Sequence, residues 1–293
     1  MATPLRNLLR LALVVFSVTA IFAQTPLEES ERGMTSYVAF QGSRSEQGEV
    51  MKFDPALGYN FTPHFGMSFG IPIYFVRTAA TATSPSGSNN GLGNAHLDLK
   101  LTYLHPVVNF GSILTAYAPS GDRDKGLSTG RVTFDWNNHL DRSFSRLTPF
   151  AEAGIGNTVV DSSFFTRPFT SLGFITHATA GIDLRVWRFI RTGVSGYSIL
   201  PVGDQKVFSK LVNKGGTVKG SGSHGRVFET SSLTVGTSDI AQDDGFSAWI
   251  DAHPSATLDM SFGYNRSIHY DLNVMSFGVG LNLGKVFNKV ASH

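Results

Sequence analysis

Charged and histidine side chains recur at every second position in several segments, and they are the groups here that could do chemistry. Lys52 and Asp54 are two residues apart, as are His96, Asp98 and Lys100. Side chains two apart lie on the same face of a β-strand. The residues that follow this pattern are Lys52, Asp54, His96, Asp98, Lys100, Asp135, Glu152, Asp183, Arg185, Arg191, Asp251 and Asp259. They would either select a passing solute by its charge or neutralise one another as an interior ion-pair network.

The histidine and carboxylate residues of the sequence form no recognisable catalytic motif. The chain has nine histidines, but none belongs to a nucleophile elbow or to a paired-histidine metal motif. His105 and His253 each directly precede a proline, which is typical of turns. Asp243-Asp244-Gly245 could ligate a cation, although solvated loop charge is the more ordinary interpretation. We therefore predict no catalytic residue, no metal site and no cofactor.

Long β-strands are the elements predicted to carry these charges. From Met51 to Phe61, apolar side chains alternate with polar or small ones, and the pattern resumes from Met67 to Phe75 after Pro63-His64. An apolar period of two indicates a strand with one apolar face. Both runs exceed the about 5–6 residues of a typical soluble strand. They match the about 9–11 residues that a strand needs to cross a membrane.

The alternation recurs along the whole chain. The predicted strands lie at 36–44, 51–61, 67–75, 97–103, 108–114, 132–137, 148–159, 174–186, 190–195, 246–250, 258–264 and 275–283. Tight turns near residues 63, 105, 143, 187 and 254 alternate with long connections near 85, 124, 166 and 222. Outer-membrane barrels join their strands by short periplasmic turns and longer external loops. A secreted β-sandwich or jelly roll would also alternate, but with shorter strands and less asymmetric turns.

We therefore predict an all-β fold, a closed antiparallel transmembrane β-barrel of about twelve strands with both termini on the periplasmic side. A further strand at Val227–Val235, inside the longest connection, makes fourteen strands the alternative, because barrels of this type have an even number. Lipid-facing apolar side chains would turn the charged residues inward, because Arg or Lys on the lipid face costs about 2–4 kcal/mol near the midplane.

The N-terminus has the composition of a secretory signal peptide. Arg6 and Arg10 precede the apolar run Leu11–Phe16, and small residues follow. Cleavage is predicted after Ala20 or, with preference, Ala23; an uncleaved membrane anchor is the alternative. The predicted organisation is a signal peptide at 1–23, a short periplasmic segment at 24–34, the barrel at 35–287 and a C-terminal tail at 288–293. The absence of cysteine fits an exported protein that is not stabilised by disulfides.

Overall charge argues against a nucleic-acid partner. The chain has 24 Lys and Arg against 22 Asp and Glu, and two of the basic residues, Arg6 and Arg10, lie in the predicted signal peptide. Subtracting those two leaves 22 against 22, whereas proteins held by phosphate contacts need a basic surface.

Aromatic side chains near the predicted strand ends fit the two girdles of a membrane barrel. The candidates are Tyr37, Phe61, Phe65, Tyr74, Tyr103, Trp136, Trp187 and Tyr264. Ordinary hydrophobic packing is the alternative explanation for them.

Two glycine-rich motifs resemble a known family. Gly91-Leu92-Gly93-Asn94 enters a predicted strand, and Ala118-Pro119-Ser120-Gly121-Asp122 precedes Gly126-Leu127-Ser128-Thr129-Gly130. The chain resembles, over roughly residues 35–285, the transporter-like outer-membrane barrels of the "MetA pathway of phenol degradation" family. The resemblance implies a channel for small, often aromatic or hydrophobic, molecules.

The sequence thus predicts an outer-membrane channel or facilitator from a Gram-negative bacterium. Its expected partners are outer-membrane lipid, the barrel-assembly machinery and a small-molecule solute. A structural or adhesion barrel with a plugged lumen and an outer-membrane lipid hydrolase are the alternatives.

Overall fold

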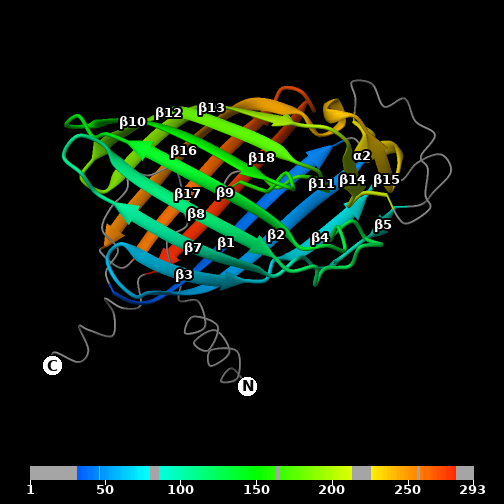
Figure 1. Cartoon of the computed structure of the whole chain (residues 1–293), viewed down its shortest axis with the longest axis horizontal. Helices are drawn as coiled ribbons and strands as arrows, with labels where there is room; N and C mark the ends of the chain where they lie inside the picture. The colour runs from blue at the N-terminus through cyan, green and yellow to red at the C-terminus, as the bar shows by residue number, and fades with distance from the viewer. Residues whose placement is uncertain are drawn as a thin grey trace, which may run out of the picture.

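Alternating side chains close the chain into a ring of twelve antiparallel strands (Figure 1). The structure is a computed structural model and describes residues 32–45, 47–79, 86–162, 165–212, 226–255 and 258–281. The predicted signal peptide, most of the 24–34 segment and the predicted tail lie outside the described residues. The ring closes because β1 pairs with β2 on one side and with β18 on the other. The barrel strands are β1 (Gly33–Ser45), β2 (Gly48–Asn60), β3 (Phe65–Gly70), β4 (Ile73–Thr78), β7 (His96–Tyr103), β8 (Asn109–Tyr117), β9 (Thr133–Asp141), β10 (Leu147–Gly156), β12 (Ile175–Trp187), β13 (Ile190–Pro201), β16 (Asp243–Ser255), β17 (Leu258–Ser267) and β18 (Leu272–Leu281).

One of the twelve barrel strands is interrupted. β3 pairs with the second half of β2 and β4 pairs with its first half, so the two occupy a single place in the ring. The interruption falls at Ile71 and Pro72. Proline has no backbone N–H to donate, so it breaks a ladder of this kind.

The two ends of the barrel differ in their connections. At the end that we call the turn end, the described connections are 61–64, 104–108, 142–146 and 188–189. At the opposite end, the loop end, the long connections are 79–95, 118–132, 157–174 and 202–242. β1 starts and β18 finishes at the turn end (Figure 1). The β1–β2 and β17–β18 connections at the loop end are short, so the predicted alternation is present in the other four loop-end connections.

Two predictions for the second half of the chain, a strand and a turn, are wrong. Val227–Val235 adds no barrel strand, because it forms helix α2 (Val227–Thr230) and then β15 (Leu233–Gly236) of a separate small sheet. The tight turn predicted at His253-Pro254-Ser255 belongs to β16, whose register with β17 shifts between Ala252 and Ser255. Such an irregularity lets the strand continue past a proline.

Secondary structure in the long connections gathers at the loop end. A three-stranded sheet there has the order β11-β14-β15. The small elements are β5 (Gly87–Ser88), β6 (Gly91–Leu92), β11 (Phe169–Leu172), β14 (Gln205–Ser209) and the 3₁₀-helix η1 (Ser238–Ala241). Among the described residues, no helix has the length and apolar character needed to cross a membrane.

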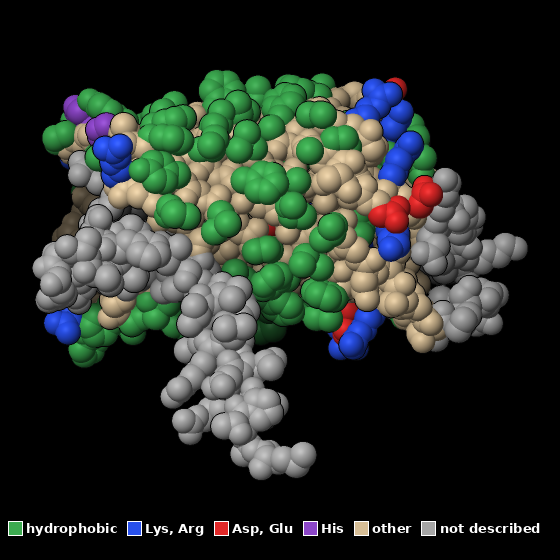
Figure 2. Space-filling view, turned by 90° about the horizontal axis from the view of Figure 1, so that it is seen from below, with side chains coloured by type: hydrophobic (Ala, Val, Ile, Leu, Met, Phe, Trp, Pro, Cys, Tyr) green, Lys and Arg blue, Asp and Glu red, His purple; other side chains and the backbone are tan. Residues whose placement is uncertain are grey.

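The two faces of the wall are sharply different. Phe69, Leu101 and Ile250 face outward and are 50%, 53% and 53% exposed. Their neighbours in the alternation are turned inward, and many of these are buried. Figure 2 shows hydrophobic side chains spread over the wall, with charged ones gathered toward the two ends. Membrane barrels present an apolar band to lipid and keep a polar interior.

Candidate functional site

The polar inner wall carries the charged residues singled out by the alternation. Lys52, Asp135, Asp183 and Asp251 are buried. Arg185 is exposed at the turn end, where its guanidinium donates to the Ser145 carbonyl over 2.6 Å. The half-buried members of the set are Asp54, His96, Asp98, Lys100, Glu152, Arg191 and Asp259.

Histidine–carboxylate pairs bring several of these side chains together. His177 Nε2 lies 2.9 Å from Asp135 Oδ1, and His253 Nδ1 lies 2.6 Å from Asp259 Oδ1. His139 Nδ1 lies 2.9 Å from Glu152 Oε1. His139 and His177 were not among the predicted inward-facing residues, although both alternate with outward-facing neighbours on their strands and the same two-residue period identifies them.

The three histidine–carboxylate pairs show a charge pairing and not a nucleophile–base pairing. His139, His177 and His253 each place a ring nitrogen within 3 Å of a carboxylate oxygen, of Glu152, Asp135 and Asp259 respectively. Nucleophilic catalysis needs a nucleophile within hydrogen-bond reach of its base.

A loop that crosses the lumen is the main feature that the sequence analysis did not anticipate. We call residues 157–174, between β10 and β12, the crossing loop. β10 and β1 are six strands apart in either direction, counting β9, β8, β7, β3 with β4, β2 and β1 one way, and β12, β13, β16, β17, β18 and β1 the other. They therefore stand on opposite walls. Gln41 of β1 nevertheless donates to the Ser162 carbonyl over 3.0 Å and accepts from Thr166 Oγ1 over 2.6 Å.

Asp161 anchors the crossing loop to the wall formed by β2 and β4. Its Oδ2 accepts from the Tyr74 hydroxyl over 3.0 Å and lies 3.3 Å from Lys52 Nζ. Its Oδ1 accepts from the Arg167 backbone N–H over 2.8 Å. Burial opposes ionisation, but the charges of Lys210 and Lys52 outweigh it and lower the pKa of Asp161 to about 2. Asp161 is therefore an ionised anchor at neutral pH.

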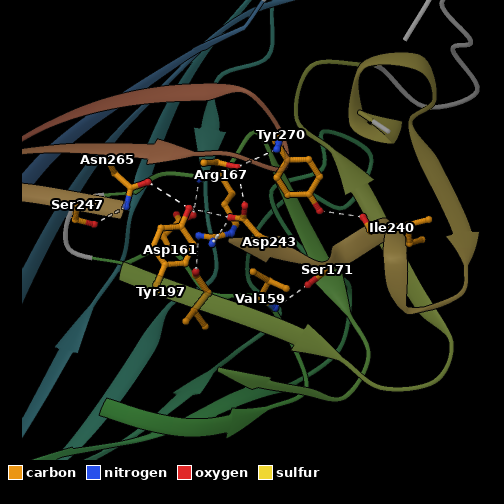
Figure 3. Close-up of polar contacts among 12 residues, drawn as sticks. Val159, Asp161, Arg167, Ser171, Tyr197, Ile240, Asp243, Ser247, Asn265 and Tyr270 are labelled. Atoms are coloured by element: carbon orange, nitrogen blue, oxygen red, sulfur yellow. Dashed lines mark hydrogen bonds and ion pairs between the residues drawn. The ribbon is translucent and has the colours of Figure 1, made fainter. Parts of the chain in front are cut away.

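Arg167 anchors the same loop to β16. Its Nη2 lies 3.0 Å from Asp243 Oδ2, with both side chains almost fully buried (Figure 3). Asp243 also accepts from the hydroxyls of Tyr197 over 3.2 Å and Ser267 over 2.6 Å. Neither a cation site nor solvated loop charge describes Asp243, because β16 begins there and the side chain is already inside the barrel. Separating the two would leave a buried charge without its partner, so the ion pair opposes release of the loop.

Lys210, from the connection between β13 and β16, locks a second loop onto the first. Its Nζ donates to the Arg167 carbonyl over 2.7 Å and lies 4.3 Å from the centre of the Tyr74 ring. Its own carbonyl accepts from Asn89 over 3.1 Å. Burial lowers the pKa of Lys210 to about 8.

Apolar side chains complete the closure of the loop end. Val50 and Val76 of the barrel wall pack in one cluster with Phe165, Phe169 and other loop residues. Gly126 fits tightly in this assembly, since its φ is +67° and a Cβ there would overlap the Ser209 carbonyl. The loops thus form a packed, hydrogen-bonded plug across the loop end of the lumen.

Two of the aromatic-girdle predictions are wrong. Tyr37 and Tyr74 are 8% and 6% exposed. They occupy the inward parity of β1 and β4, opposite the exposed Phe40 and Phe75. Of the other candidates, Tyr264 is half-buried, and those exposed on the described surface are Phe61, Phe65, Tyr103, Trp136 and Trp187.

Comparison with known proteins bears on the fold alone. No protein-family model matches the chain, and no curated protein sequence matches it significantly. Among solved structures, an outer membrane channel from Pseudomonas putida F1 aligns with 90% of this chain and 100% of its own, with a TM-score of 0.58 at 11% identity. The NanC porin aligns with 84% of this chain and 99% of its own, with a TM-score of 0.50 at 6% identity. The chain therefore has the fold of outer-membrane channel barrels.

Proposed function

We propose that this protein is an outer-membrane channel for small molecules whose own loops gate the lumen. The observation that carries the proposal is the closed ring of strands with an apolar outer face and a charged inner wall. A wall of this kind seals against lipid while presenting ionised groups to the interior. The likeness to two solved channel barrels supports the same role.

The loop end is assigned to the outside of the cell. Short connections in barrels of this type face the periplasm and long ones face outward. The predicted signal peptide and the start of β1 at the turn end agree with that orientation. The plug would then control entry from the exterior.

Small aromatic or hydrophobic solutes are the class that the family resemblance favours. The first motif, Gly91–Asn94, starts at β6, which pairs with β4 in the wall of the loop end. The second motif contains Gly126, which seats the neighbouring loops together. Both motifs therefore belong to the entrance, where solutes would be admitted.

A plugged structural barrel is the second candidate, and the crossing loop is the observation that favours it. The two candidates differ in whether the docked loops ever leave the lumen. They predict different currents across a membrane.

Planar-bilayer recording of the refolded, heat-modifiable protein tests the proposal. Stepwise ohmic openings in the wild-type protein support a channel. Folded protein that inserts and still seals the bilayer at all voltages would refute it in favour of the plugged structural barrel.

A further inference from the structure

The turn-end half of the lumen contains an aromatic pair beside two carboxylates, away from the plug. Phe150 of β10 and Trp249 of β16 lie with ring centroids 6.0 Å apart and planes at 60°. They form a small buried cluster of their own. Phe150 also stacks on the His139 ring, with centroids 5.6 Å apart. Neither ring belongs to the crossing loop.

Glycines on the two intervening strands make room for the aromatic rings. β12 and β13 separate β10 from β16 in the sheet. A Cβ on Gly193 of β13 would overlap the Trp249 indole, and one on Gly181 of β12 would overlap the Phe150 ring. Both rings therefore lie close against the wall instead of standing out into the lumen.

Two carboxylates flank the indole. Asp183 and Trp249 are both paired with Gly193, from opposite sides, so the three form one row across β12, β13 and β16. Asp251 lies two residues beyond Trp249 on the same inner face, opposite Arg191. The acids and the indole thus share one patch of wall.

The carboxylate of Asp251 has unmet bonding capacity. Its side chain is 1% exposed, and neither oxygen accepts a hydrogen bond within the described residues. Asp183 is also 1% exposed and its Oδ2 is unpartnered in the same part of the chain. Arg191 and His253 act on Asp251 through their charges without donating a hydrogen bond to it. Burying a carboxylate without donors is costly, so a positively charged donor would be stabilised here.

The chemistry of the patch selects an organic cation. Ionised carboxylates only accept hydrogen bonds, and the face of an indole attracts cations. A metal ion is less suitable, because no group of three or more His, Cys, Asp or Glu side chains in the described ranges is arranged to hold one. An ammonium group attached to an aromatic or alkyl body satisfies both the acids and the rings.

We propose that Asp183, Trp249 and Asp251 form a subsite for the amino group of a small organic cation. The proposal rests on the proposed channel function, since it names the class of solute that the lumen would accept. We call these three residues the amine subsite. Arg191 lies opposite Asp251 in the register, on the turn-end side of the subsite.

Calorimetric titration of the full-length protein in detergent tests the subsite without requiring any current. The probes are 2-phenylethylamine and its neutral analogue 2-phenylethanol, each corrected for its heat of partition into empty micelles. The wild-type protein should bind the amine in preference to the alcohol. Asp251→Asn should weaken amine binding by about tenfold or more, as expected for loss of a charge-assisted hydrogen bond, and leave the alcohol unchanged.

Asp122→Asn is the matched control, because it removes the same charge from a half-exposed loop side chain. It should bind the amine like the wild-type protein. Equal affinity for amine and alcohol, or an Asp251→Asn protein that is heat-modifiable and binds the amine normally, would overturn the subsite. Selective amine binding by a protein that never conducts would refute the channel and keep the subsite, so the two failures are distinguishable.

Discussion

Removing the charge of Arg167 should release the crossing loop without unfolding the barrel. Arg167→Met keeps much of the length of the side chain and leaves Asp243 buried opposite an apolar group. The Arg167 and Asp243 side chains are 3% and 0% exposed, and breaking such a pair from one side costs about 3–5 kcal/mol. Every 1.4 kcal/mol is a factor of ten, so the population of undocked loop should rise by roughly 10²- to 10⁴-fold.

Most of that cost comes from the carboxylate that loses its partner. Adding Asp243→Asn to Arg167→Met removes the stranded charge, and the amide keeps partners in Tyr197 and Ser267. The double variant should therefore recover most of the docking.

Cysteine labelling measures the docking directly, because the chain has no cysteine of its own. Val159→Cys places a small apolar thiol at a position that is 4% exposed within the plug. Labelling of that thiol should be slow in the parent, fast with Arg167→Met and slow again in the double variant. Equal rates in the parent and Arg167→Met, or a double variant that labels as fast as the single one, would refute the reasoning.

Three further predictions concern the wall, the loop packing and pH. Phe69→Lys should block membrane assembly, because a cation on the lipid face costs about 2–4 kcal/mol, whereas Ser68→Lys on the inner face should still give a heat-modifiable band; equal effects would contradict the assigned faces. Gly126→Ala should speed labelling of the Val159→Cys thiol, because the added Cβ would overlap the Ser209 carbonyl. Gly203→Ala should not, because Gly203 has a similar φ of +71° but nothing within 4 Å of the added Cβ. Similar labelling rates for the two variants would show that backbone strain alone matters. Lys210 has a pKa of about 8 in the folded chain, against an ordinary value of 10.5. Between these two pH values the docked loop binds fewer protons than the released loop. Docking therefore strengthens as the pH rises from about 8 to 10.5. Open probability should accordingly fall from pH 8 to pH 10, and a rise would reverse the sign of the argument.

The strands of the barrel could be predicted because apolar and polar side chains alternate along each strand of a membrane barrel. Each predicted strand in the ring has its counterpart in the structure, since lipid on one side and a polar interior on the other impose a local period. Pro72 shows the limit, because the period continues through Ile71 while the hydrogen-bonded ladder does not. Val227–Val235 shows another, because a short alternating run also suits a small surface sheet.

The plug could not be predicted from the same period. Asp161 meets Lys52 and Tyr74, and Arg167 meets Asp243, only because the loop folds back across the whole ring. No spacing along the chain encodes a contact between opposite walls. The two-residue period does assign Tyr74 and His139 to the inner face, because each alternates with outward-facing neighbours on its strand.

Single-channel recording of Arg167→Met beside the wild-type protein tests the central claim that the protein's own loops gate its lumen. Arg44→Met is the control, because Arg44 lies at the loop end in an exposed pair, 3.5 Å from Glu49. We predict brief openings for the wild-type and Arg44→Met proteins, and long openings of larger mean current for Arg167→Met. Identical currents from all three folded proteins, or a bilayer that stays sealed with Arg167→Met, would contradict the account.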